Sequence, residues 1–202
     1  MLERIGGWLA AFLLALAVVS AGPALAQSQP AAPDVTQLQV ERNDEGVVLS
    51  ATVRFDLPAV IDDALGKGIP MFFVAEASIF RGRWYWYDKR VAGAVRHMRL
   101  SYQPLTRRWR LQVSSSPIGH SGMVLGQNFD SRDEALAAIQ RISRWRIADP
   151  GEVDPELPHE VQFRFRLDLS QLPRPFQIGA VGQSEWSIQA MRVHRLLPEA
   201  AR

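Results

Sequence analysis

The chain has 202 residues, a formal net charge of +2 and no cysteine. Without cysteine it has no thiol nucleophile, no thiolate metal ligand and no disulfide. The charge excess is too small to indicate a nucleic-acid-binding protein, because that class carries a strongly basic surface.

The N-terminal segment has the pattern of a secretory signal peptide. Arg4 supplies a positive start, an apolar run covers residues 8–19, and Ala24-Leu25-Ala26 supplies small residues where a signal peptidase cuts. The apolar run is shorter than the ~20 residues that a helix needs to span a bilayer. We therefore expect residues 1–26 to be removed near Ala26–Gln27, leaving a periplasmic chain without a transmembrane helix. The alternative is an uncleaved N-terminal anchor.

The remaining chain has the length of one ordinary domain. Residues 27–34 contain the polar, proline-bearing segment QSQPAAP, which predicts a disordered linker. Residues 35–197 are predicted to form a single β-rich domain, and residues 198–202 a polar tail.

Alternating apolar and polar residues predict strands over most of this domain. The strand over residues 69–80 is apolar on both faces at its start, which predicts a central strand covered on both sides. Two further strands flank the turn QPLT with their apolar residues opposite each other, which predicts an antiparallel hairpin. The predicted strands cover Val47–Leu57, Ile69–Phe80, Val95–Tyr102, Arg108–Val113, Val161–Leu169 and Trp186–Val193.

Two helices are predicted between these strands. A short one begins at Pro58, a favourable first helical residue, and runs to Leu65. A longer one covers SRDEALAAIQRISRW, residues 131–145, where Ser131 and Glu134 form a capping box. Its apolar residues, including Ile142 and Trp145, recur at helical spacing.

The order of these elements predicts a mainly β, α+β fold with antiparallel sheets. The first expectation is an antiparallel β-sandwich with one long packed helix and one short helix. The second is a curved sheet wrapped on the long helix.

Catalytic and metal-binding motifs are missing from the sequence. None of the four histidines pairs with another at zinc-ligand spacing. The segment GHSG around Ser121 has its second glycine one residue too early for a nucleophile elbow. Adjacent Asp62 and Asp63 point about 100° apart on a helix, so they do not form a carboxylate pair and are expected to be solubilising charges. We expect no catalytic residue, no metal, no cofactor and no enzymatic activity. The alternative is a hydrolase whose site forms only in three dimensions, with His97 and a distant carboxylate.

The segment RGRWYWYDKR, residues 81–90, is the most aromatic stretch of the chain. Side chains of Trp and Tyr bury large areas while keeping a polar tip near water, and arginine stacks on such rings. One interpretation is that these rings complete the core. The other is that one face contacts a partner, a glycan or a lipid headgroup. The candidate contact residues are Trp84, Tyr85, Trp86 and Tyr87 with the flanking Arg81 and Arg83.

Arginines recur on the polar faces of the predicted strands. Strung across one sheet, they would suit phosphate or carboxylate groups, which guanidinium binds through paired hydrogen bonds. The candidate partners are an envelope protein or an anionic lipid or glycan. The alternative is that these residues only keep the outer faces polar. The arginines are Arg54, Arg99, Arg108, Arg110, Arg164 and Arg166.

Four segments carry a resemblance to a known family: RWYWYD, GIPMFF, RLSYQPLTRRWR and LDLSQLPRPFQIGA. Together they resemble the bacterial exported-protein family catalogued as domain of unknown function 4390, over residues 35–194. Tyr102, Leu105 and Thr106, and also Leu172, Pro173 and Pro175, match its pattern. The segment Ser114–Gln127 is longer and richer in glycine than that pattern.

The resemblance implies neither an activity nor catalytic residues. Members of the family are often encoded near a membrane sensor kinase of the nitrogen-regulation type, which implies an accessory role in the periplasm. We therefore expect a non-catalytic, exported binding or interaction module that assists envelope sensing. A purely structural envelope protein is the further alternative.

Overall fold

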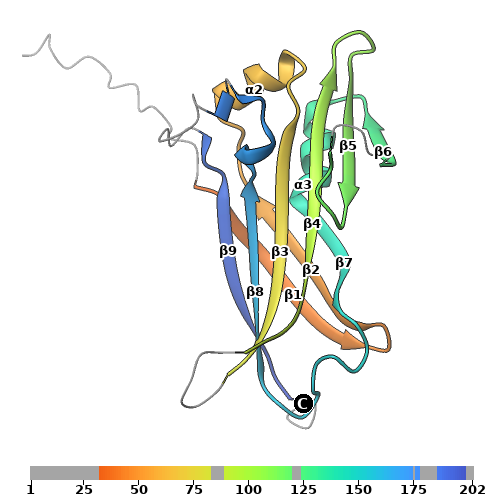
Figure 1. Cartoon of the computed structure of the whole chain (residues 1–202), viewed down its shortest axis with the longest axis vertical. Coiled ribbons are helices and arrows are strands. Elements are labelled where there is room, and N and C mark those ends of the chain that lie inside the picture. The colour runs from red at the N-terminus through yellow and green to blue at the C-terminus, as the bar shows by residue number, and fades with distance from the viewer. Residues whose placement is uncertain (1–31, 83–88, 120–123, 175, 178–185, 199–202) are drawn as a thin grey trace, which may run out of the picture. The chain divides into compact units, whose positions relative to one another are not determined.

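The computed structural model describes residues 32–82, 89–119, 124–174, 176–177 and 186–198. Within these ranges the backbone is mainly β, with strands β1 to β9, two short α-helices and one 3₁₀ turn (Figure 1). Every strand pairing is antiparallel. The prediction of a mainly β fold with antiparallel sheets is therefore confirmed. Residues 1–26, predicted as a signal peptide, lie outside the described residues.

The strands form two sheets of unequal size. The small sheet has the order β1-β2-β7, and the large sheet has the order β6-β5-β4-β3-β8-β9. The small sheet consists of Asp34–Asn43 (β1), Gly46–Arg54 (β2) and Arg141–Ala148 (β7). The large sheet consists of Met71–Arg81 (β3), Lys89–Gln103 (β4), Arg108–Ser114 (β5), Gly126–Phe129 (β6), His159–Leu167 (β8) and Gln189–Leu196 (β9).

Strand β3 is central in the large sheet, between β4 and β8, as its apolar sequence predicts. Strands β4 and β5 form the predicted hairpin. Across it, Leu100 lies opposite Leu111 and Tyr102 lies opposite Trp109, with ring centroids 5.0 Å apart. The alternating pattern was therefore sufficient to predict both the strands and their pairing.

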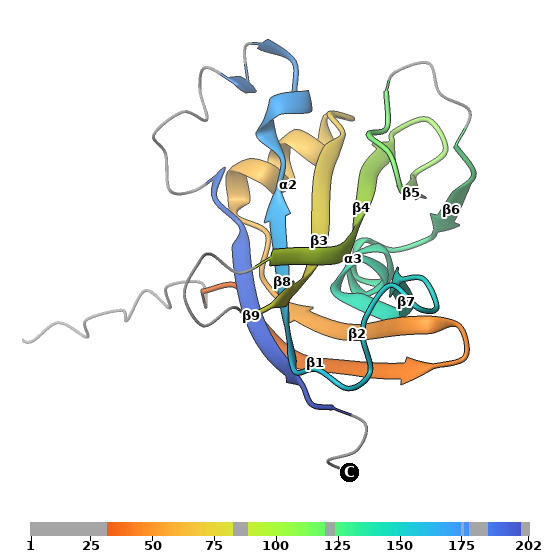
Figure 2. The same ribbon diagram turned by 60° about the horizontal axis from the view of Figure 1, so that its bottom comes forward.

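The small sheet lies against one face of the large sheet, and the two share one hydrophobic core (Figures 1 and 2). Phe55, which follows β2, packs between Phe73 of β3 and Phe165 of β8, with ring centroids 5.7 and 5.3 Å away. Packed rings at such separations add to the stabilisation from buried area. These three rings therefore join the two sheets at the centre of the core.

The sheets also approach each other along both sides. On one side β1 runs along β9, and the guanidinium of Arg192 donates a hydrogen bond to the carbonyl of Val35. On the other side β4 approaches β7, and the guanidinium of Arg96 lies 5.0 Å from the ring centre of Trp145. Burial lowers the pKa of Arg96.

The two α-helices lie at the ends of strands. Helix α2, Ala59–Gly66, begins and ends one residue later than predicted, with Pro58 as its N-cap, and buries Ile61, Ala64 and Leu65. Helix α3, Arg132–Gln140, contacts β5, β6 and β7 (Figure 2). Its first turn is capped as predicted, because the backbone N–H of Glu134 donates to Ser131 Oγ over 3.2 Å.

The prediction of one long helix over residues 131–145 is wrong. Helix α3 ends at Gln140, and β7 begins at Arg141. A bulge in β7 explains the error, because Ile142 pairs with Ala51 and Trp145 with Leu49, so two residues of β7 oppose one of β2. Ile142 and Trp145 are thus three positions apart on one buried face, which imitates helical spacing.

Arg42 of β1 joins three segments that are distant in sequence. Its guanidinium donates to the carbonyl of Leu197 over 2.7 Å and to that of Asp154 over 3.4 Å. It also lies 3.4 Å from Nδ1 of the buried His159, which donates to the carbonyl of Leu157 over 2.9 Å. Burial, with Arg42 and Arg81 nearby, lowers the pKa of His159. Folding therefore favours the neutral form of His159.

We expect Phe165→Ala to destabilise the protein by about 3–5 kcal/mol, because it removes a fully buried ring and leaves a cavity. The free energy of unfolding in urea measures the effect. As a control on the same strand, Gln162→Ala lies on the opposite face and should change that free energy by no more than about 0.5 kcal/mol. Similar losses for the two variants would contradict the packing described here.

We expect His159 to make the protein less stable as the pH falls below the ordinary histidine pKa of 6.5. The unfolded chain takes up a proton there that the folded chain does not, so stability declines until the pH reaches the lowered pKa. Urea midpoints between pH 8 and pH 5 measure this slope, and His159→Asn should reduce it. An unchanged slope in His159→Asn would show that His159 is not the group responsible.

Candidate functional site

The large sheet places five of the predicted arginines on its outer face, away from the small sheet. Directly paired residues of antiparallel strands share a face, and so do residues two apart on a strand. Because Phe73 and Phe165 are buried in the core, their neighbours Phe72, Val74 and Arg166 point outward. The same register brings to that face Arg99 of β4, Arg108 and Arg110 of β5, and Arg164 and Arg166 of β8. We call these five residues the arginine face.

The arginines differ in their ion pairs. Arg108 lies 3.4 Å from a carboxylate oxygen of Asp130, and Arg166 lies 3.5 Å from one of Asp168. Arg99, Arg110 and Arg164 have no acceptor among the described residues. Exposed ion pairs contribute little to stability, so the pairs of Arg108 and Arg166 leave both side chains available to a ligand.

Two glycines leave room for arginine side chains to lie flat on the sheet. A methyl group added at Gly126 would come within 2.5 Å of Nε of Arg110. One added at Gly93 would come within 2.6 Å of Nη2 of Arg90. Arg90 pairs with Phe80 and so lies on the outer face as well. Any side chain at positions 93 or 126 would displace these guanidinium groups.

Phe72 lies at the centre of the arginine face. It is buried, and the guanidinium carbon of Arg99 lies 5.7 Å from its ring centre. On the other side, the backbone N–H of Asp168 donates to the carbonyl of Phe72 over 2.7 Å. His97 lies on the same face, opposite Val74. Burial chiefly lowers the pKa of His97, with Asp168 raising it and Arg166 lowering it. The arginine face thus has a densely charged centre around one buried ring.

Asp168 is occupied by structural hydrogen bonds. Its carboxylate accepts from the hydroxyl of Ser170 over 2.7 Å, from the backbone N–H of Ser170 over 3.2 Å and from the amide of Gln171 over 3.2 Å. Burial raises the pKa of Asp168, but these bonds together with Arg166 outweigh burial and lower it. Asp168 therefore stays ionised and begins the 3₁₀ turn Leu169–Gln171.

Exposed apolar side chains border the arginine face on β9. Met191 pairs with Arg164 and is 51% exposed, and Val193 pairs with Gln162 and is 45% exposed. Arg195 lies farther along the same face, opposite Glu160. Sequence reasoning missed Arg195 because it placed the end of the last strand at residue 193.

Three other predicted residues lie away from the arginine face. Arg54 is on the small sheet, opposite Asp34. Arg81 pairs with His159 and so belongs to the inner face of β3, where it lines a hollow of about 510 Å³ together with Leu157 and Leu196. Arg83 lies outside the described residues, as do Trp84, Tyr85, Trp86 and Tyr87.

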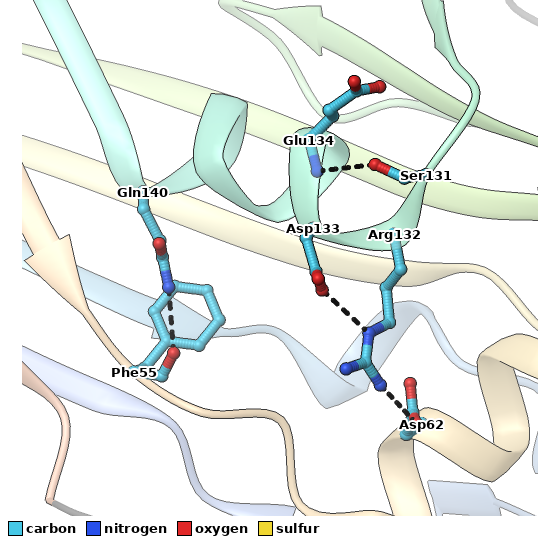
Figure 3. A network of polar contacts seen from close by, with 7 residues as sticks. All are labelled: Phe55, Asp62, Ser131, Arg132, Asp133, Glu134 and Gln140. Carbon is cyan, nitrogen blue, oxygen red and sulfur yellow. Dashed lines mark hydrogen bonds and ion pairs between the residues drawn. The ribbon is translucent and has the colours of Figure 1, made fainter.

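Asp62 has a structural role that the sequence did not indicate. Arg132 of α3 donates to its carboxylate over 2.6 Å and lies 3.4 Å from the carboxylate of Asp133 (Figure 3). The hydrogen bond to Asp62 raises the pKa of Arg132. In the same network, the amide of Gln140 donates to the carbonyl of Phe55 over 2.9 Å. These contacts join α3 to α2 and to the end of β2.

The residues considered for catalysis are only partly brought together. Ser114 lies opposite His97 across β4 and β5, and Asp168 acts on His97 electrostatically. No hydrogen bond joins His97 to either residue within the described part of the chain, and its Nδ1 is buried without a partner. His120 and Ser121 lie outside the described residues.

In the described ranges, no three acidic or histidine side chains gather closely enough to hold a metal ion. No helix in those ranges has the length and apolarity needed to cross a membrane.

Comparison with known proteins identifies the family of the chain. No curated protein and no solved structure matches the chain. One family model matches residues 31–196, which include every described strand and helix. The chain therefore belongs to the family described as Domain of unknown function (DUF4390).

Proposed function

We propose that this protein is an exported, non-catalytic binding module that engages an anionic partner through its arginine face. The observation that carries the proposal is the gathering of Arg99, Arg108, Arg110, Arg164 and Arg166 on one outer face, three of them without an acceptor among the described residues. The scaffold is a sandwich-like packing of the two sheets.

The charge balance of this face supports an anionic partner. Its acidic residues are fewer than its basic ones, and one of them, Asp168, is already engaged by Ser170 and Gln171. Guanidinium groups are weakly hydrated and bind carboxylate and phosphate oxygens with paired hydrogen bonds. An anionic lipid, an acidic glycan or an acidic envelope protein would supply such oxygens.

The predicted signal peptide indicates in which compartment the protein acts. Removal of residues 1–26 would release the module into the periplasm, where an accessory role beside a membrane sensor kinase agrees with the family resemblance. In that role the arginine face would contact the partner, and the small sheet would only support it.

The other functions have less support. A hydrolase would need His97 to activate a hydroxyl or water through a hydrogen bond, and within the described residues His97 makes none. A purely structural role in the envelope does not require guanidinium groups without acceptors on one face. A protein with that role would tolerate their neutralisation without loss of any binding.

Neutralising the arginine face should weaken its attraction for polyanions. We expect the triple variant Arg108→Gln, Arg110→Gln and Arg164→Gln to elute from an immobilised sulfated polysaccharide at distinctly lower salt than the unmodified protein, because clustered charges act together. The matched control is Arg54→Gln, Arg141→Gln and Arg144→Gln on the small sheet, which removes the same charge. If both triple variants elute together, only net charge matters and the proposal fails.

The predicted signal peptide should be cleaved from the chain after Ala26. When the full chain is expressed in a bacterium, mass spectrometry of the periplasmic fraction should find a protein that begins at Gln27. Large residues block signal peptidase at the small-residue positions, so Ala24→Trp with Ala26→Trp should leave the full-length chain in the membrane fraction. Recovery of the unmodified chain at full length would instead support the uncleaved anchor.

A further inference from the structure

Two arginines of the arginine face belong to the two strands that flank Phe72. Arg99 extends over the ring of Phe72, its direct partner on β3. Arg166 of β8 lies opposite Val74, two residues along β3 from Phe72. Its guanidinium reaches toward Asp168, whose backbone N–H donates to the carbonyl of Phe72 on the side away from Arg99. Both cations therefore flank Phe72, one from each neighbouring strand.

His97 completes this group. Val74 of β3 lies between His97 of β4 and Arg166 of β8. His97 is also two residues from Arg99 on the same strand. It is close enough to Arg166 and Asp168 for both charges to act on its imidazole. Glu76 of β3 and Ser114 of β5 are the other polar residues beside it on this face. Three nitrogen-bearing side chains thus lie beside Phe72 and Val74 on the outer face.

This group lacks acceptors. Nε of Arg99 and Nδ1 of His97 are buried and make no hydrogen bond within the described residues. Of the nearby carboxylates, that of Asp168 receives three hydrogen bonds from Ser170 and Gln171. The contact of Asp168 with Arg166 is correspondingly long, at 3.5 Å. The carboxylate of Glu76 pairs with none of these three side chains within the described residues. Buried donors without partners are costly, so a bound acceptor would stabilise this arrangement.

The number and charge of these donors select the ligand. A carboxylate offers two oxygens and one negative charge, and two arginines alone would saturate it. A terminal phosphate group offers three oxygens and ≈ −1.5 to −2 charge at neutral pH, enough for two guanidinium groups and an imidazole. Imidazole also gains a proton readily beside such a charge.

We propose that Arg99, His97 and Arg166 form a binding subsite for a terminal phosphate group, carried either by a soluble molecule or by a lipid headgroup. This inference rests on the proposed function and names the ligand chemistry at the centre of the arginine face. Arg164 and Arg110 provide long-range attraction around the subsite without touching the phosphate.

The test uses the full chain after export, with two probes. Inorganic phosphate represents the soluble source, and vesicles of phosphatidylcholine with phosphatidic acid represent the lipid source. Binding is followed through the ring protons of His97 by NMR, and for vesicles also by co-sedimentation. Saturable binding of either probe, with a rise in the pKa of His97, is expected because a nearby dianion stabilises the imidazolium. Saturation by inorganic phosphate indicates the soluble source, and binding of vesicles alone indicates the lipid source.

Variants separate the subsite from the general charge of the face. Arg99→Gln and Arg166→Gln should each weaken binding about tenfold or more, since each removes charge-assisted hydrogen bonds. The matched control, Arg164→Gln, removes the same charge two residues from Arg166 and should weaken binding by about twofold or less. Thermal unfolding of each variant shows whether the fold is retained, and Arg99→Lys, which keeps the charge but loses the fork, provides a second, milder change.

Asp168→Asn gives a result that a disrupted fold would not produce. Asparagine still accepts the capping hydrogen bond from Ser170 but removes the nearby negative charge. Phosphate should therefore bind several-fold more tightly to this variant.

Two outcomes would overturn the subsite: equal weakening by Arg164→Gln and Arg99→Gln, or no saturable binding of either probe by the unmodified protein. Neither outcome alters retention on the polyanion column, which tests the proposed function separately.

Discussion

The register of β8 on β3 is the constraint on which both the core and the candidate site depend. In each strand the odd-numbered residues face the small sheet, so Phe73 and Phe165 meet Phe55 in the core. The even-numbered residues of both strands must then face outward, because side chains alternate between the two faces of a sheet. A slip of one residue would bury Arg164 and Arg166 and expose the aromatic rings, so the free energy of burying these rings also fixes the position of the charges.

Ion pairs accompany some of the arginines in the described residues and not others. Arg132 has Asp62, Arg144 has Glu45 and Arg146 has Asp149, and on the arginine face Arg108 has Asp130 and Arg166 has Asp168. Arg99 and Arg110 lie opposite the uncharged residues Gln112, Ser101 and Asn128. Folding alone gains nothing from cations without acceptors, because outward positions could hold neutral polar residues at no cost. The proposed anionic partner would supply the acceptors that Arg99 and Arg110 lack within the described residues.

Regular alternation of apolar and polar residues made several strands predictable, whereas β-bulges obscured the pattern of others. The strands that alternate without interruption, such as β8 and β5, were predicted with their correct faces, which also placed the five arginines together. Strand β1 was missed because a bulge after Val35 interrupts its pattern, and β7 was read as helix for the same reason. The centre of the site was not predictable, because Phe72, His97 and Asp168 meet only through pairings between strands distant in sequence.

The central position of β3 also has a kinetic consequence. Its pairing with β4 is local and can form early, whereas its pairing with β8 must wait until most of the chain is available. Proteins dominated by such distant contacts fold slowly, because the entropy of closing a long loop is lost before the contacts compensate for it. A chain of this topology therefore stays unfolded for longer after synthesis than one of the same length built from local contacts.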